Sequence, residues 1–324
     1  MIILTGVSGF IGSCLLTHLN KNGYDREVVV VDDFYKLYKD KNTDNKNVRE
    51  WMHRDIFLDW FEKTSQKIDF VLHMGARTDT TLLDKSVFDT LNVEYSQRIW
   101  KVCARRQIPL IYASSAATYG DGSLGFSDSH GIAAQLHPLN PYGDSKQQFD
   151  LWVLEQGEKP PFWVGCKFFN VYGPNEYHKG RMASVVLHTF NKIKATNSMQ
   201  LFRSHRPDIM DGHQSRDFIY VKDVLCIIQY MMEHKDNIQS GLFNFGTGKA
   251  RTFLDLARNT FKSLNMKDNI SFVDTPEDIR DTYQYFTEAD ITKLLDTGYD
   301  KPFWSLEEGV EDYVRGYLMP GLYY

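Results

Sequence analysis

The sequence lacks the features that mark membrane, disulfide-rich and metal-binding proteins. None of its apolar runs approaches the roughly 20 residues that a helix needs to cross a bilayer. Its few cysteines lie far apart and form no CxxC pair, so they indicate neither a zinc site nor a disulfide framework; they are Cys14, Cys103, Cys166 and Cys226. Isolated thiols are typical of a reducing compartment, so we expect a cytoplasmic protein.

An excess of charge of one sign is also missing. The 324 residues carry 37 Lys and Arg against 42 Asp and Glu, a formal net charge of −5. This balance gives no global attraction to nucleic acid or to an anionic membrane, and we expect neither as a partner. The length allows one large domain or two modest ones, and the 42% of hydrophobic residues is enough for a full core.

Strand and helix patterns alternate in the first half of the chain. Short apolar runs predict strands at 2–5, 28–31, 69–73, 108–113 and 162–169. Helical spacing of apolar residues predicts helices at 10–22, about 85–106 and from near Tyr142. This alternation predicts an α/β fold, in which a doubly wound parallel sheet carries helices on both faces.

The second half is less regular. Residues 203–217 are polar, include a proline and a glycine, and predict a loop. We expect helices near 181–196, 221–234, 252–265, 287–295 and 306–318. No linker separates the halves, so we expect one compact unit with a cleft.

A glycine-rich turn follows the first predicted strand and opens the first helix. In Gly6-Val7-Ser8-Gly9-Phe10-Ile11-Gly12, glycine recurs at every third position. Gly6 permits a tight turn, Gly9 lets the backbone approach a pyrophosphate, and Gly12 lets the helix pack on the strand. The helix N-terminus then offers N–H groups and partial positive charge to phosphates. The pattern predicts a dinucleotide site.

Two acids, Asp32 and Asp33, end the second strand, where a ribose-binding carboxylate belongs. Asp32 favours NAD, because a carboxylate repels a 2′-phosphate. Lys39 and Arg54 lie just downstream and can hold that phosphate. The residues alone therefore leave NAD and NADP equally open.

A tyrosine and a lysine, Tyr142 and Lys146, lie four residues apart and share one helix face. A free phenol titrates near pH 10, but a neighbouring ammonium and an oxidised nicotinamide favour the phenolate. Ser115 ends the preceding strand, at the edge where doubly wound sheets bind ligands, and can hydrogen-bond a substrate oxygen.

These motifs occur in the order that extended short-chain dehydrogenase/reductases show, together with blocks at 169–174, 216–224 and 243–248. The chain resembles that family, whose members modify nucleotide sugars, over nearly its whole length. The resemblance implies an NADP-binding Rossmann domain over 1–170 plus about 215–250. It also implies a smaller C-terminal α/β substrate-binding domain over 171–214 plus 251–324.

Residues 116–118 bear on the reaction. The family's dehydratases carry an acid pair here, whereas this chain has Ala116, Ala117 and Thr118, so nothing protonates a leaving hydroxyl and elimination is disfavoured. The stretches 175–185, 283–290 and 298–303 resemble instead the ADP-glyceromanno-heptose 6-epimerases, which invert C6 of the heptose in ADP-heptose.

That resemblance implies a mechanism and an assembly. These epimerases oxidise C6 with tightly bound NADP and return the hydride to the opposite face, and their use of NADP favours NADP over NAD here. Tyr142 and Lys179 match the two acid/base residues, Ser115 would orient the oxygen, and Lys146 would position Tyr142 and the cofactor. The family forms homo-oligomers, including pentamers, and no metal site is expected.

Further site residues are implied position by position. Those matching the cofactor site, beside the three glycines, are Phe10, Ile11, Asp32, Asp33, Lys39, Arg54, Met74, Gly75, Ala76, Arg77, Asn92, Lys146 and Val171. Those matching the substrate site are Ser115, Asn170, Lys179, Arg181, His188, Phe202, Arg203, Ser204, Arg216 and Tyr283. Arg216 is the best candidate for a bidentate hold on the diphosphate, whereas His188 fits a helix histidine facing water equally well.

The chain departs from better-known members at a longer 205–215 loop and at Arg77, Arg181 and Arg203. Two alternatives remain at this point. One is another nucleotide-sugar epimerase, such as a UDP-hexose 4-epimerase, which has no need of Lys179. The other is a dinucleotide-binding sensor, which has no use for the base Tyr142.

Overall fold

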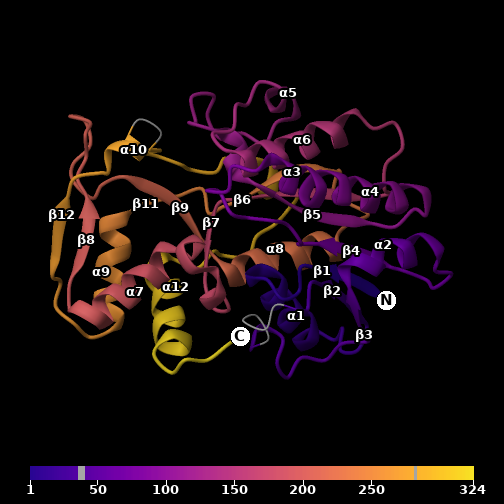
Figure 1. The fold of residues 1–324 in the computed structure, drawn as a ribbon, viewed down its shortest axis with the longest axis horizontal. Helices are drawn as coiled ribbons and strands as arrows, with labels where there is room; N and C mark the ends of the chain where they lie inside the picture. Colours follow the sequence, from indigo (N-terminus) through magenta and orange to yellow (C-terminus); the bar gives the residue numbers. More distant parts are fainter. Residues whose placement is uncertain (36–40, 281–282) are drawn as a thin grey trace.

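The computed structural model describes residues 1–35, 41–280 and 283–324. Its main sheet is built from β1 (Ile2–Thr5), β2 (Val28–Asp32), β3 (Glu50–His53), β4 (Phe70–His73), β5 (Leu110–Ser115), β6 (Trp163–Phe168) and β10 (Gly241–Phe245). All seven strands run parallel in the order β10-β6-β5-β4-β1-β2-β3 (Figure 1). The predicted doubly wound parallel sheet is confirmed.

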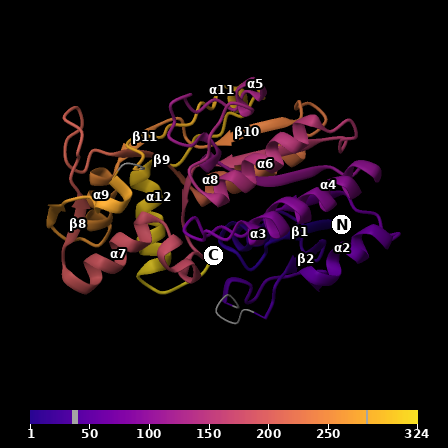
Figure 2. The same cartoon turned by 45° about the horizontal axis from the view of Figure 1, so that its top comes forward.

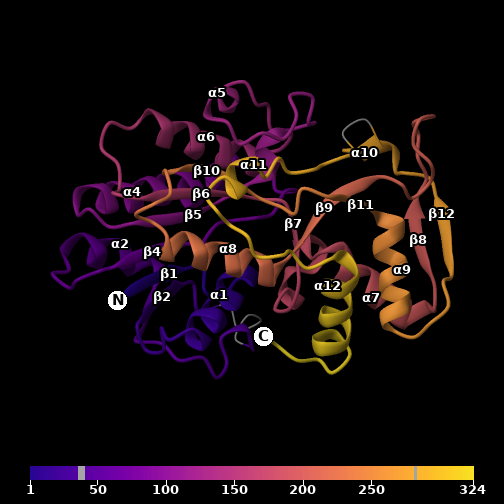
Figure 3. The same ribbon diagram turned by 180° about the vertical axis from the view of Figure 1, so that it is seen from behind.

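Helices cover both faces of this sheet. One face carries α2 (Arg54–Lys63), α4 (Tyr95–Arg105) and α6 (Pro141–Glu155), and the other carries α1 (Phe10–Lys21) and α8 (Val221–Glu233) (Figures 2 and 3). The valines of β2 show how burial on both faces of the sheet determines the sequence of a strand. Val28 and Val30 join the core under α1 and α8, whereas Val29 and Val31 join the core under α2 and α4. A strand buried on both faces therefore needs an unbroken apolar run.

Two smaller sheets lie beyond the main sheet, at the end of the molecule away from β3 (Figure 1). Their strands are β7 (Asn170–Tyr172), β9 (Ser215–Tyr220) and β11 (Ala250–Thr252) in one sheet, and β8 (Met199–Phe202) and β12 (Ile270–Val273) in the other. The helices beside them are α7 (Val185–Thr196), α9 (Phe253–Ser263) and α12 (Leu306–Tyr313). This is the smaller C-terminal α/β part that the family resemblance implied.

The other named helical segments among the described residues are short. They include α3 (Lys85–Phe88), α5 (His130–Ala133), α10 (Glu277–Arg280), α11 (Thr292–Leu295), the 3-10 turns Ala116–Tyr119 and Tyr177–Met182, and the π turns Asp89–Glu94 and Val314–Leu318. Within the described ranges, no helix combines the length and the apolar character that a bilayer crossing demands.

Three predicted boundaries in the second half are wrong. The helix expected over 287–295 is only α11, because the backbone before it bonds elsewhere: Thr287 N donates to Ser215 O at 3.2 Å. The loop expected over 203–217 ends before Ser215, where β9 begins; β9 pairs first with β11 and then with β7. The helix expected from 181 starts at Val185, since the Ser184 hydroxyl caps it by accepting from Leu187 N.

Candidate active site

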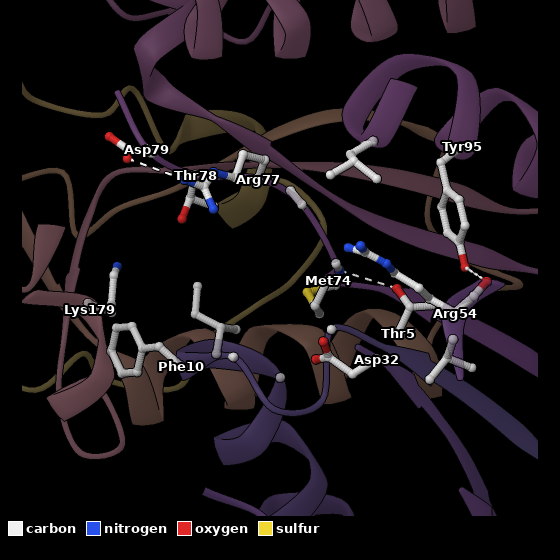
Figure 4. A pocket seen from close by; sticks show the side chains of 18 of the residues that line it. Thr5, Phe10, Asp32, Arg54, Met74, Arg77, Thr78, Asp79, Tyr95 and Lys179 are labelled. Atoms are coloured by element: carbon white, nitrogen blue, oxygen red, sulfur yellow. Dashed lines mark hydrogen bonds and ion pairs between the residues drawn. The ribbon is translucent and has the colours of Figure 1, made fainter. Parts of the chain in front are cut away.

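A cavity of about 420 Å³ lies at the carboxyl ends of β1 and β4 (Figure 4). The chain leaves β1 into α1 on one face and β4 toward α4 on the other, so the direction of winding changes here. Doubly wound sheets bind ligands at this switch point. The predicted residues that line the cavity are Gly6, Gly9, Phe10, Ile11, Gly12, Asp32, Arg54, Met74, Gly75, Ala76, Arg77 and Lys179.

The glycine turn forms one wall of the cavity, and its geometry requires glycine. Gly6 has φ +74°, and a Cβ there would lie 2.5 Å from Gly75 N; a Cβ on Gly12 would lie 2.1 Å from Gly6 O. Gly9, the N-cap of α1, provides no side-chain cap, so N–H groups of the first turn are available to a phosphate. These features fit the diphosphate of a dinucleotide.

The acid and the cation expected beside the adenosine ribose lie together in the cavity (Figure 4). Asp32 Oδ2 accepts from Ser8 N at 2.8 Å, which fixes the carboxylate against the glycine turn. Arg54 reaches into the cavity and pairs with Asp33 at 3.4 Å. The predicted cation Lys39 lies outside the described residues.

The predicted catalytic group forms where α6 meets the end of β5. Asn140 caps α6 by accepting from Gly143 N at 2.9 Å, and the side chains of Tyr142 and Lys146 then share one face. The Ser115 hydroxyl lowers the pKa of Tyr142, and Lys146 Nζ donates to Ala113 O at 2.7 Å. The predicted trio is therefore assembled at the edge of the sheet that borders the cavity.

The environment of this trio changes its proton affinities. Burial raises the pKa of Tyr142, and the hydrogen bond with Ser115 opposes that rise. Burial lowers the pKa of Lys146 to about 8, although the negative charge of Asp150 acts to raise it. Ionising Tyr142 therefore depends on the hydroxyl of Ser115 and on positive charge close to the phenol.

Asn92 ties the trio to the cavity wall. Its side chain accepts from Arg77 N at 2.8 Å and donates to Ser145 Oγ at 2.9 Å. Arg77 lines the cavity, and Ser145 adjoins Lys146 on α6. Movement of α6 would therefore disturb the cavity directly.

Lys179 enters the cavity from the 3-10 turn Tyr177–Met182 (Figure 4). Its ammonium lies 5.3 Å from the centre of the Phe10 ring. Burial lowers the pKa of Lys179, and the neighbouring carboxylate of Glu176 opposes that shift. A lowered pKa brings an ammonium closer to the range in which it exchanges protons at neutral pH.

Most of the other predicted substrate residues gather away from this cavity. Arg216 is buried, with its guanidinium 5.5 Å and 5.6 Å from the rings of Phe253 and Tyr283. Phe202 packs edge-on against Tyr283 at 6.0 Å, so these side chains form an aromatic group around one cation. Ser204 follows Arg203 beside them and donates from its backbone N to Asp211 at 2.9 Å.

Four predicted residues take other positions. Arg181 is exposed and hydrogen-bonds Thr81, and His188 on α7 contacts Arg181 O at 3.2 Å on an exposed face. Asn170 is exposed on β7, and Val171 is partly buried next to it. None of these four side chains is among those that line the cavity described here.

Sequence reasoning missed part of the cavity lining and one buried histidine. The missed lining residues are Thr5, Val31, Asp79, Val87, Leu91, Tyr95 and Met182. The histidine is His73, whose ring contacts Thr5 Oγ1 at 2.6 Å and Ser96 Oγ at 2.9 Å, and whose pKa falls to about 3 through burial. A polar residue closing an apolar strand, as Thr5 and His73 do, was the available signal.

Comparisons with known proteins identify the family of the chain. The model of the NAD dependent epimerase/dehydratase family matches residues 2–246. The ADP-L-glycero-D-manno-heptose-6-epimerase of Fusobacterium nucleatum is 44% identical over 98% of both chains. The same-named protein of Nitratidesulfovibrio vulgaris is 45% identical, again over 98% of each.

The crystal structure of the Helicobacter pylori ADP-L-glycero-D-manno-heptose-6-epimerase superposes with a TM-score of 0.79 at 28% identity, covering 97% of this chain and 95% of that one. The resemblance inferred from the sequence is thus confirmed. The chain belongs to the NAD dependent epimerase/dehydratase family.

Proposed function

We propose that this protein converts ADP-D-glycero-D-manno-heptose to ADP-L-glycero-D-manno-heptose by transient oxidation and re-reduction at C6 with bound NADP. The observation that carries the proposal is the place of Lys179. It lines the same cavity as the glycine turn, while Tyr142 and Ser115 form a second acid/base group at the neighbouring strand end. The heptose epimerases named above are the relatives that support the substrate.

Each residue of the site has a distinct task. A dinucleotide held at the glycine turn would supply the hydride transfer to and from the sugar carbon. Tyr142 exchanges the proton of the C6 oxygen on one face, and Lys179 exchanges it on the other. Ser115 holds that oxygen near Tyr142, and Lys146 supplies the positive charge that favours the phenolate.

The choice of NADP rests on Arg54. Its guanidinium reaches into the cavity near Asp32 and can hold a 2′-phosphate that the carboxylate alone would repel (Figure 4). Mass spectrometry of the nucleotide released on denaturation tests this choice. We expect NADP from the wild type and a shift toward NAD in Arg54→Ala. The control Arg98→Ala, which breaks an exposed ion pair with Glu62, should release NADP.

The remaining parts of the proposal concern the rest of the chain. Residues 1–170 plus about 215–250 bind the dinucleotide, and 171–214 plus 251–324 bind the sugar nucleotide, with Arg216 holding the diphosphate.

The four cysteines are free thiols, which supports a reducing, cytoplasmic location. We also propose a homo-oligomer, a pentamer by resemblance, which sedimentation would test.

The decisive experiment is a substrate assay. Purified protein with ADP-D-glycero-D-manno-heptose, and no added cofactor, should yield the L-glycero epimer. Turnover of a UDP-hexose with no conversion of the heptose would contradict the proposal and favour a 4-epimerase. Unchanged nucleotide binding with no turnover of either substrate would favour a sensor.

A further inference from the structure

An ion pair that the proposed mechanism does not use lies beside the catalytic group. Asp150 on α6 and Lys167 on β6 have side chains only 0% and 1% exposed, and Lys167 Nζ lies 2.8 Å from Asp150 Oδ2. Burying two charges costs free energy that their attraction repays only with good geometry and further hydrogen bonds. A pair buried this deeply is therefore a candidate for a role other than stability.

The further hydrogen bonds are present, and they join four elements. Asp150 Oδ1 accepts from the Tyr112 hydroxyl at 3.0 Å, and Oδ2 accepts from Ser114 Oγ at 2.6 Å. Lys167 Nζ also donates to Thr118 Oγ1 at 2.8 Å. One buried network thus connects α6, β5, β6 and the 3-10 turn Ala116–Tyr119.

This network ends on both sides of Ser115. Ser114 precedes it on β5, and Thr118 Oγ1 donates to the Ser115 carbonyl at 2.8 Å. The Ser115 hydroxyl, whose interaction with Tyr142 lowers the pKa of the phenol, accepts from Ala117 N at 3.1 Å. The direction of the Ser115 side chain is therefore fixed through residues that Asp150 and Lys167 hold.

The same pair sets the charge around Tyr142. Tyr142, Lys146 and Asp150 follow one another at four-residue spacing, so they lie on one face of α6. The charge of Asp150 raises the pKa of both Lys146 and Tyr142. Lys167, in contact with Asp150, offsets that charge.

We infer that Asp150 and Lys167 are positioning residues of the proposed reaction: they hold Ser115 against Tyr142 and balance the charge that decides whether the phenol ionises. This inference rests on the proposed function, because it concerns the same catalytic group. It assigns the pair no contact with substrate.

Charge variants of the pair test the inference through the pH dependence of kcat/KM. Asp150→Asn leaves the Lys167 ammonium unopposed and so favours the Tyr142 phenolate. The acid limb of the pH profile, where kcat/KM rises as Tyr142 ionises, should therefore move to lower pH by about one unit. Lys167→Met leaves the carboxylate unopposed, so the same limb should move to higher pH by about one unit. The double variant should return the limb to the wild-type position.

The control is Lys222→Met, which breaks the ion pair with Asp312 (2.6 Å) between α8 and α12 and should move nothing. The inference would be overturned if the acid limb of both single variants shifted in one direction or did not shift. It would also be overturned if the acid limb of the double variant stayed away from the wild-type position. Lys167→Met alone could fail to fold. Asp150→Asn is isosteric and keeps an acceptor for Lys167, so the difference in pH profile between it and the double variant then provides the test.

A second readout does not need turnover. Tyrosinate absorbance of each variant, minus that of the same variant carrying Tyr142→Phe, gives the titration of Tyr142 alone. It should show the same opposed shifts. If the wild type fails to convert ADP-heptose, the proposed function fails, and this titration still decides whether the pair controls Tyr142.

Discussion

Replacing Lys179 by methionine tests the second acid/base of the proposed reaction. Methionine keeps an apolar stem against Phe10 but removes the ammonium that lies 5.3 Å from the ring centre. General acid/base catalysis contributes about 10²–10⁴ in rate, which corresponds to about 3–5 kcal/mol in the barrier. We therefore expect the rate of epimerisation to fall by about 10²–10⁴, because inversion needs proton exchange on both faces.

The fold should survive this change. The Lys179–Phe10 contact is worth about 1 kcal/mol or less, since it is a single cation–π contact near a cavity. Thermal unfolding should therefore stay close to the wild type, and nucleotide should still be retained. A loss of bound nucleotide equal to the loss of rate would mean that Lys179 builds the cavity and does not exchange protons.

Two matched variants separate proton transfer from charge. Lys179→Arg keeps a cation over Phe10, but a guanidinium does not give up its proton, so the rate should fall nearly as far. Lys192→Met removes an exposed lysine of α7 and should leave the rate at the wild-type level. Full activity in Lys179→Arg would refute the reasoning. Rates are measured by separating the two epimers of ADP-heptose.

Three further predictions follow from the site and its surroundings. Gly6→Ala should abolish nucleotide retention or folding, because its Cβ would lie 2.5 Å from Gly75 N. The control Gly157→Ala places a Cβ where nothing lies within 4 Å, so thermal unfolding and the content of bound nucleotide should both match the wild type. Ser115→Ala removes the hydrogen bond that lowers the pKa of Tyr142, so the acid limb of kcat/KM should move to higher pH; a shift to lower pH would contradict this. Burial raises the pKa of Asp223 from 3.8 to about 7, so its stabilising contribution is present at low pH and is lost as pH rises through about 7. Urea unfolding should show Asp223→Asn more stable than the wild type at pH above 7, by about 2–4 kcal/mol, and equal to it at low pH.

The sequence predicted the parts of the fold that depend on local pattern. The valine run of β2 is buried on both faces, and the glycine turn needs glycine at Gly6 and Gly12 for contacts with neighbouring backbone. Tyr142 and Lys146 fall on one face because helical spacing places them there. Each of these predictions was made from residues that are near in the chain, although the neighbour that restricts Gly6 is the distant Gly75.

Features that depend on distant partners were not predictable in this way. Lys167 lies in the middle of a predicted strand, and only Asp150 arriving on α6 explains its burial. The segment before α11 has helical spacing, but Asp217 accepts from Ala289 N at 3.0 Å and holds it outside the helix. Arg216 stays the proposed partner of the diphosphate, but its position between Phe253 and Tyr283 became visible only in three dimensions.

The most direct test of the account follows one atom. ADP-D-glycero-D-manno-heptose that carries deuterium at C6 is incubated with the purified protein in ordinary water, and the product is examined by NMR. The account predicts the L-glycero epimer with deuterium still at C6, because the bound carrier returns the hydride that it received. An epimer whose C6 carries protium from water would contradict it.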